Sequence, residues 1–460
     1  MKPFFLSCFA VFFFISVHAQ TGAHPAAAPK SPASDTWKPF LSNGKWGYKD
    51  TTGKVVIQPK LNFLWCYHFS EGFAVVQNND YTYSYINTTG VNSFNKSFEF
   101  AQDFSDKMAA VMENETFGYI NTTGQYAFPD KFYEVYPYHE GFASVKKGGK
   151  YFYINKQGKN QFGQTYSDLN AFSEGFAAVN KTGKKWSYID KTGKDAFNGQ
   201  EFDDAGDFSS GYAQVLTGGR YHFIDHNGKN AFDQEFDIAY HYAFGYAVVK
   251  KDDESGYYFI DNTGKNRFGG TYDFVDGYQD GAAVAERNDK YYYIDTSGHR
   301  IRGGKAFDDC YAYHYGIIPV KEGGSWHYID ENGKDPFDRD FDRAYQFGNG
   351  IALIMNNDKF YFIDETGQNP FGQTFDDASE FTHGFARVTR GDSVFFIDRR
   401  GKIAFGNFEE VNDDGLPFSN YYVKAKQNGK WGLINLQGKP VIEFRYSDPD
   451  NCPAKLPDNE

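Results

Sequence analysis

One short pattern recurs along almost the whole chain at nearly constant spacing. Asp or Asn is followed three residues later by Gly in twelve places, and successive glycines lie 34 to 37 residues apart. An Asp or Asn side chain can bond to its own backbone two residues on, and Gly readily takes the left-handed conformation at the end of such a turn. The pattern therefore predicts twelve turns, which end at Gly53, Gly90, Gly124, Gly158, Gly193, Gly228, Gly264, Gly298, Gly333, Gly367, Gly401 and Gly438.

Two short apolar segments precede each turn. In one copy they are residues 175–179 (Gly-Phe-Ala-Ala-Val) and 186–189 (Trp-Ser-Tyr-Ile), and Gly opens the first segment in nine copies. A few polar residues separate the two segments, which is typical of an antiparallel hairpin. A third, weaker element follows the turn with the form Phe-Asp-x-Ala, as at residues 202–205. Each unit is therefore expected to hold two strands and a short third strand or turn.

The composition agrees with strands and turns. The chain has 48 Phe, 35 Tyr and 48 Gly but only 11 Leu, and no segment of the array shows a helical period. A unit of about 35 residues cannot bury a core alone, so neighbouring units must cover one another. We predict an all-β tandem array of about twelve 35-residue hairpin or meander repeats over residues 40–446, forming an open solenoid or superhelix. β-Propeller-like rings are the alternative.

These repeats resemble the WG-repeat (KWG-repeat) family of bacterial β-repeat proteins. The resemblance rests on residues 45–48 (Lys-Trp-Gly-Tyr) with 53–59, on residues 430–434 (Lys-Trp-Gly-Leu-Ile) with 438–442, and on the Ser-Glu-Gly-Phe-Ala stretches that begin at Ser70 and Ser173. In the middle of the chain Trp-Gly is replaced by other aromatic pairs. The resemblance implies an exported or envelope-associated repeat protein and no catalytic residues.

The two ends of the chain differ from the array. Residues 1–19 have a basic start, an apolar run and Val17-x-Ala19, the pattern of a secretory signal peptide. We therefore expect export to the periplasm, the cell surface or the medium, with no membrane span after cleavage. Residues 20–39 form an Ala/Pro/Ser-rich leader, and residues 447–460 form a polar tail that we expect to fray. The net charge of −13 and the lack of a basic block argue against nucleic acid as a partner.

Residues able to do chemistry are present but lack catalytic or metal-binding spacing. Cys66, Cys310 and Cys452 are predicted to be isolated thiols, with one long-range disulfide left open. The histidines form no metal motif, so we expect no metal and no cofactor. The Asp of Phe-Asp-x-Ala repeats from unit to unit and is predicted to be structural. The one extended acidic insertion, Asp252-Asp253-Glu254, could serve a hydrolase.

The residue between Trp and Tyr in each Trp-x-Tyr strand is the strongest candidate for binding. It is small in the terminal units and aromatic across the middle, and an exposed column of aromatics would form a binding face. The alternative is that the column is a second core layer between units. The candidate residues are Phe152, Tyr258, Tyr292, Tyr361 and Phe395.

Together these features predict an exported, non-catalytic repeat protein that acts as a binding or scaffold module for protein or glycan. The alternatives are a carbohydrate-active hydrolase on a propeller-like fold and a purely structural envelope protein.

Overall fold

The computed structural model describes residues 33–42, 45–279, 281–313, 316–348, 350–412, 418 and 421–454. The predicted signal peptide and residues 20–32 of the leader lie outside this part. Its helices are the 3-10 turns η1 (Ala33–Thr36), η2 (Arg302–Gly304) and η3 (Pro449–Asn451). Within the described ranges, no helix has the length and apolar character needed to cross a membrane.

The strands form twelve antiparallel sheets, numbered here in chain order, in which consecutive strands are neighbours. Sheets 1 to 4 are β1 (Lys38–Ser42), β2 (Lys45–Lys49), β3 (Val55–Leu61); β4 (Trp65–Ser70), β5 (Phe73–Gln77), β6 (Tyr83–Asn87); β7 (Phe100–Ala101), β8 (Met108–Glu113), β9 (Thr116–Asn121); β10 (Glu134–Val135), β11 (Ala143–Lys147), β12 (Lys150–Ile154). Sheets 5 to 8 are β13 (Asp168–Leu169), β14 (Phe176–Asn180), β15 (Trp186–Asp190); β16 (Asp204–Ser209), β17 (Tyr212–Thr217), β18 (Arg220–Ile224); β19 (Ile238–Ala239), β20 (Tyr246–Lys250), β21 (Tyr257–Asp261); β22 (Phe274–Val275), β23 (Ala282–Glu286), β24 (Tyr291–Asp295). Sheets 9 to 12 are β25 (Asp309–Cys310), β26 (Ile318–Glu322), β27 (Ser325–Ile329); β28 (Arg343–Ala344), β29 (Ile351–Asn356), β30 (Lys359–Asp364); β31 (Asp377–Ala378), β32 (Phe385–Arg390), β33 (Ser393–Asp398), β34 (Ile403–Phe408); β35 (Glu410–Asn412), β36 (Tyr422–Gln427), β37 (Lys430–Asn435), β38 (Pro440–Tyr446). The predicted all-β array of twelve units is confirmed.

The repeated turn has the predicted bonding. In sheet 5 the Thr192 N–H donates to Asp190 Oδ1 at 2.8 Å, and the Gly193 N–H donates to the Asp190 carbonyl at 2.9 Å. Gly193 has φ +79°, in the left-handed region. Phe162 of the preceding unit packs so closely that a Cβ at Gly193 would lie 2.5 Å from its ring. Gly is therefore needed here both for backbone conformation and for contact between units.

The Phe-Asp-x-Ala element joins two sheets. Phe202 exchanges two backbone hydrogen bonds of 2.9 Å with Trp186 at the outer strand of sheet 5, and β16 then starts sheet 6 at Asp204. Between β13 and β14 of sheet 5, residues 174 and 175 both have positive φ and form a two-residue turn between Ser173 and Phe176, which are bridged. Sheets 2 to 10 therefore gain a bridged fourth segment beyond their three strands, and sheets 11 and 12 have a full fourth strand.

Tyrosine hydroxyls add a second link between neighbouring sheets. The last residue of Trp-x-Tyr donates its hydroxyl to a backbone carbonyl of the next sheet, as from Tyr188 to Gly206 at 2.6 Å and from Tyr119 to Tyr136 at 2.7 Å. A buried hydroxyl needs such an acceptor. The large number of tyrosines thus has a structural use at the sheet boundaries.

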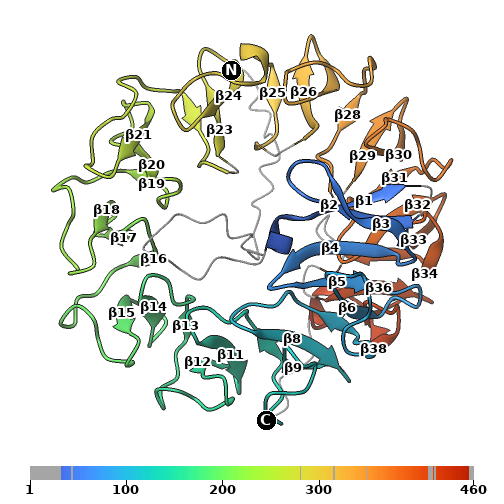
Figure 1. Cartoon of the computed structure of the whole chain (residues 1–460), viewed down its shortest axis with the longest axis horizontal. Helices are drawn as coiled ribbons and strands as arrows, with labels where there is room; N and C mark the ends of the chain where they lie inside the picture. Colours follow the sequence, from blue (N-terminus) through green and yellow to red (C-terminus); the bar gives the residue numbers. More distant parts are fainter. Residues whose placement is uncertain are drawn as a thin grey trace.

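The twelve sheets follow one another around a ring (Figure 1). In sheets 5 to 7 the first strand lies nearest the axis and the third lies farthest from it (Figure 1), and sheets 2 to 12 share this strand order. We call the first strands of sheets 2 to 12 the inner strands. The sheets are therefore oriented radially, like propeller blades.

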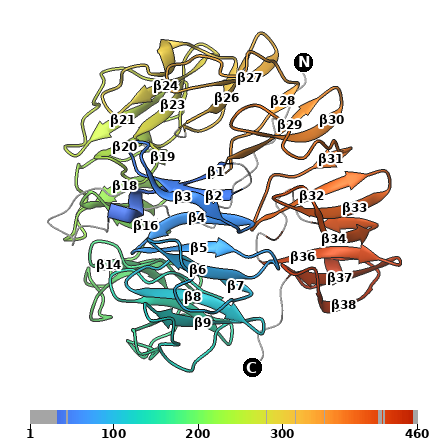
Figure 2. The same ribbon diagram turned by 45° about the vertical axis from the view of Figure 1, so that its right-hand side comes forward.

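The ends of the array overlap instead of meeting edge to edge, and Figure 2 shows the early and late strands as separate layers. Sheet 2 contacts sheet 11, where the Arg399 guanidinium lies 3.6 Å from the centre of the Trp65 ring. Sheet 3 contacts sheet 12, where the rings of Phe100 and Tyr421 are 4.5 Å apart. Nine sheets therefore make one turn of an open superhelix, and buried residues from both layers form one large core cluster.

Residues after the last strand pack on sheet 12. Lys424 Nζ donates to the Pro449 carbonyl of η3 at 2.8 Å, and Cys452 is only 1% exposed. The first half of the tail, expected to fray, is thus attached by a hydrogen bond and by burial of a thiol. Cys66, Cys310 and Cys452 are free thiols in this structure.

Candidate functional site

The predicted aromatic column lies between neighbouring sheets. Tyr292 is buried, at 3% exposed, and the other four side chains are half-buried and pack against the core clusters. The Arg300 guanidinium covers the Tyr292 ring at 3.8 Å. The column therefore forms a packing layer, and its binding role stays a prediction. The residues are Phe152, Tyr258, Tyr292, Tyr361 and Phe395.

The repeated Asp of Phe-Asp-x-Ala serves the hairpin beside it. Asp203 accepts the Gly218 N–H at 2.7 Å and forms an ion pair with Lys185, which holds the pKa of Asp203 below its usual value. The same carboxylate-to-turn bond recurs at Asp273, Asp308, Asp342 and Asp376. These carboxylates are thus committed to local structure.

The acidic insertion at residues 252–254 is an exposed turn. Asp252 accepts the Ser255 N–H at 2.8 Å, and Ser255 Oγ returns a hydrogen bond to the Asp252 carbonyl at 2.9 Å. The feature that suggested a hydrolase therefore closes a surface turn. Among the residues that the structure describes, no group of His, Cys, Asp and Glu has the geometry to hold a metal ion.

A different repeat column presents aromatic side chains on the inner strands. It is the residue after Ala in Phe-Asp-x-Ala, and it is Tyr in sheets 2, 4, 7, 9 and 10. Tyr136 and Tyr240 are each 38% exposed and are two of the five large apolar side chains that are most exposed in the described chain. The members are Tyr67, Tyr136, Tyr240, Tyr311 and Tyr345. Aligning the units on Phe-Asp-x-Ala would have revealed this column from sequence.

Carboxylates accompany these tyrosines. We define the inner-strand surface, in sheets 2 to 11, as the third residue of Phe-Asp-x-Ala and the two residues that follow this motif. Arg343 is the one Lys or Arg in these positions, all of which the structure describes. The carboxylates there are Asp103, Glu134, Asp168, Asp204, Asp207, Asp276, Asp309, Asp377 and Glu380.

Cations of neighbouring strands reach two of these carboxylates. Lys146 reaches Glu134 at 3.2 Å and Arg387 reaches Asp377 at 2.7 Å, both from neighbouring strands. Burial raises the pKa of Asp276 to about 7, even though Asp276 accepts the Val284 N–H at 2.6 Å. The inner-strand surface is therefore acidic and rich in tyrosine.

The repeats match a known family of protein repeats. A family model described as "WG containing repeat" matches residues 46–81, 83–116, 117–151, 151–184, 186–221, 223–254, 259–291 and 431–448, more than half of the chain. The chain belongs to the WG-repeat family. The structure extends the WG repeats through sheets 9 to 11, which the family model leaves unmatched.

Similar solved structures are distant from this WG-repeat chain. BamB from Moraxella catarrhalis is 12% identical over 57% of this chain and 93% of its own, with a TM-score of 0.28. Hsv2 from Kluyveromyces lactis is 12% identical over 56% and 90%, with a TM-score of 0.28. A protein described as "the eukaryotic initiation factor" is 11% identical over 75% and 97%, with a TM-score of 0.32. No curated protein matches the chain, and TM-scores this low assign no function.

Proposed function

We propose that this WG-repeat protein is an exported, non-catalytic scaffold whose inner-strand surface binds an extended, positively charged protein segment. The observation that carries the proposal is that exposed Tyr136 and Tyr240 occur together with carboxylates along the inner strands of the ring. Aromatic rings hold the apolar stems of Lys and Arg side chains, and carboxylates attract their charged ends. Opposite charge also speeds association and selects partners.

The acidity of the surface favours protein over glycan. A neutral oligosaccharide would stack on the tyrosines but would gain little from nine carboxylates in the same columns. A purely structural envelope protein would tolerate replacement of both exposed tyrosines. These two alternatives therefore predict different ligands and different responses to mutation.

Fluorescence anisotropy with labelled peptides tests the proposal. We expect an alternating Lys/Ser peptide to bind, with an affinity that falls as salt rises, and a Glu/Ser peptide not to bind. The double variant Tyr136→Ala/Tyr240→Ala should weaken binding about tenfold, because buried aromatic anchors carry much of the energy in such contacts. Val91→Ala, which removes an exposed apolar side chain elsewhere, is the control. Binding of a neutral oligosaccharide without binding of the Lys/Ser peptide would favour the glycan alternative.

Export is tested separately by expressing the full chain in a secreting bacterial host. The proposal expects a mature protein outside the cytoplasm that begins at Gln20. An uncleaved chain that keeps Met1 in the cytoplasm would contradict it.

A further inference from the structure

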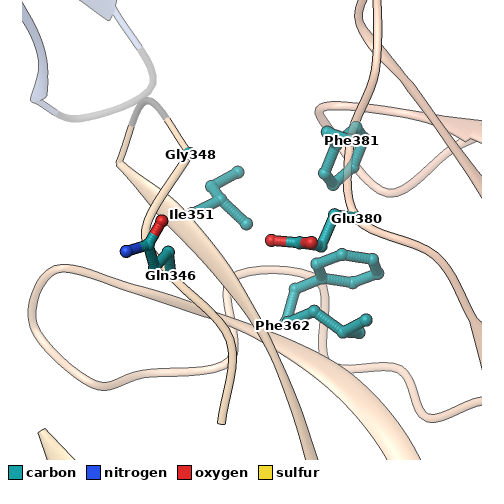
Figure 3. Close-up of a pocket in the computed structure, with 7 residues that line it drawn as sticks. Gln346, Gly348, Ile351, Phe362, Glu380 and Phe381 are labelled. Carbon is teal, nitrogen blue, oxygen red and sulfur yellow. The ribbon is translucent and has the colours of Figure 1, made fainter. Parts of the chain in front are cut away.

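A small pocket lies between sheets 10 and 11, where the inner strands β28 and β31 begin these sheets. Its cavity volume is about 40 Å³. Ile351, Leu353, Phe362 and Phe381 supply apolar walls, and Gln346 and Glu380 supply polar groups. Figure 3 shows the Glu380 carboxylate directed across the pocket toward Gln346. The space holds a few water-sized groups and nothing much larger.

Glu380 lies in the pocket wall and is half-buried there. Burial also raises the pKa of Asp103, at the same repeat position, to about 6, but the structure forms this pocket at Glu380. Among the described residues its carboxylate has no hydrogen-bond or ion-pair partner. Removal from water raises the pKa of Glu380 to about 7. A carboxylate in an apolar wall without a donor is costly, and a cation placed against it would remove that cost.

The second polar group is also an acceptor. Gln346 Nε2 donates to the Ala312 carbonyl at 2.7 Å, which leaves the amide oxygen on the side that faces Glu380 (Figure 3). The nearby Arg399 guanidinium packs on Phe381 at 4.8 Å and donates to the Gly348 carbonyl at 3.2 Å. The structure gives it no ion pair with Glu380. The pocket thus presents two side-chain acceptors and calls for a ligand that donates hydrogen bonds.

We propose that this pocket is a binding subsite for the ammonium group of a lysine side chain. The ammonium group donates to Glu380 and Gln346, and the Phe362 and Phe381 rings cover its last methylene groups. An ammonium group is compact enough for about 40 Å³, whereas a planar guanidinium is broader. The subsite deepens the proposed function and rests on it, because it assigns one anchor point to the charged segment.

The position of the pocket fits such an anchor. Gln346 directly follows Tyr345, and Glu380 lies two residues after the end of β31 at Ala378. Both polar groups therefore belong to the inner-strand surface defined above. A segment that lies on this surface therefore passes next to the pocket.

The first experiment compares peptides on the intact chain. Glu380→Gln should weaken the Lys/Ser peptide about tenfold but the matching Arg/Ser peptide less than about twofold, because one ion pair in a buried site is worth about a factor of ten. Asp253→Asn removes the same charge from an exposed turn and should change neither peptide by more than about twofold. Equal losses for both peptides, or no loss, would overturn the subsite while leaving the proposed function intact.

A second experiment tests the pocket without any peptide. The pKa of a ¹³C-labelled Glu380 carboxyl is followed by NMR with n-butylammonium chloride or n-butanol present. The subsite predicts that n-butylammonium lowers the pKa of Glu380 and that n-butanol does not, since only a cation favours the ionised form. No change with n-butylammonium refutes the subsite even if the peptides bind, and a change without peptide binding refutes only the proposed function.

Discussion

Sheets 4 to 9 form a single layer, whereas sheets 2 and 3 are stacked on sheets 11 and 12, and residues at the same repeat position make different contacts in the two regions. In the single layer Glu140 and Glu174 accept the N–H groups of Gly175 and Gly211 in the next sheet, each at 3.0 Å. In the overlap that column holds His383, whose ring lies 5.2 Å from Phe100. Glutamate, the common residue of this column, links sheets that are neighbours along the chain. Histidine, which replaces it at position 383, links one superhelical turn to the next.

Two further columns show the same contrast. Lys191, the residue after the turn Asp in sheet 5, forms an ion pair with Glu140 at 3.1 Å, whereas Arg399 at this position in sheet 11 covers Trp65. Tyr421 occupies the column of the strand-opening Gly and keeps its left-handed backbone, with φ +65°. A tyrosine in this conformation is strained unless outside contacts compensate. Departures from the repeat therefore mark the contact between turns.

The largest effect is expected when the unusual residues of the overlap are replaced by the residues that the other sheets have at the same repeat positions. Tyr421→Gly removes the contacts with Phe100 and Phe117, at a cost of about 3 kcal/mol, while relieving the strained backbone. Combined with His383→Glu, it should open the ring without unfolding the sheets, so small-angle scattering should show a larger radius with unchanged far-UV circular dichroism. Glu174→His in the single layer should leave the scattering unchanged. An unchanged radius for the double variant would show that the overlap does not depend on these two residues.

Substitutions at two turn glycines distinguish the cost of backbone strain from the cost of a clash with a neighbouring side chain. Gly193→Ala places a Cβ against Phe162 as well as in a left-handed backbone, so we expect a loss of roughly 2–4 kcal/mol. Gly53→Ala has the same strain but nothing within 4 Å of the new Cβ, and should lose roughly 1–2 kcal/mol. Chemical denaturation measures both. Equal losses would mean that the ring of Phe162 moves aside freely.

The overlap should weaken in acid. Burial lowers the pKa of His383 to about 4, below its ordinary value of about 6.5, so the opened state binds the proton more readily. Stability of the overlap is thus fully present above pH 6.5 and decreases by about 2–3 kcal/mol as the pH falls toward 4. Arg399, whose pKa burial lowers to about 10, stays charged throughout this range. Scattering radius against pH measures the opening, and His383→Gln should remove the pH dependence between these values.

The smallest effects come from single hydroxyl groups. Tyr83→Phe removes a 2.9 Å hydrogen bond to the His383 carbonyl, and Tyr188→Phe removes the bond to Gly206. Each should cost about 1 kcal/mol. Hydrogen exchange should show weaker amide protection in sheets 2 and 11 for Tyr83→Phe, and only in sheets 5 and 6 for Tyr188→Phe. A loss in sheets 2 and 11 from Tyr188→Phe would contradict the separation of the two regions.

The sequence was sufficient to predict the local repeat, because turn chemistry and strand alternation act within one unit. The Asp190-to-Gly193 turn, the hairpins and the structural Asp of Phe-Asp-x-Ala were all predicted. The number of sheets per turn could not be predicted, since it depends on small rotations summed over nine units. Tyr421 and His383 did break the column pattern, but a broken pattern alone does not name the distant residues that it contacts.

The candidate site was harder to predict than the fold. The Trp-x-Tyr column could be either a surface or a packing layer, and alternation along one strand cannot say which sheet covers it. Tyr136 and Tyr240 are exposed whereas Tyr67, Tyr311 and Tyr345 in the same column are half-buried, a difference that depends on the surroundings in the ring and not on the unit. Glu380 was one acid among many until the walls of its pocket were known.

The stacking of sheet 2 on sheet 11 is tested most directly by a cysteine pair. Arg400 Nη1 donates to Asn79 Oδ1 at 3.0 Å across the overlap, so the side chains meet although their backbones are separated by the length of the arginine. That separation exceeds the reach of a direct disulfide, so Asn79→Cys with Arg400→Cys should instead be joined by a short bis-maleimide crosslinker. Thr366, the matching turn residue of sheet 10, provides the control pair Asn79→Cys with Thr366→Cys, which should not be joined. Equal crosslinking of both pairs, or none in the first, would contradict an array whose second and eleventh sheets are in contact.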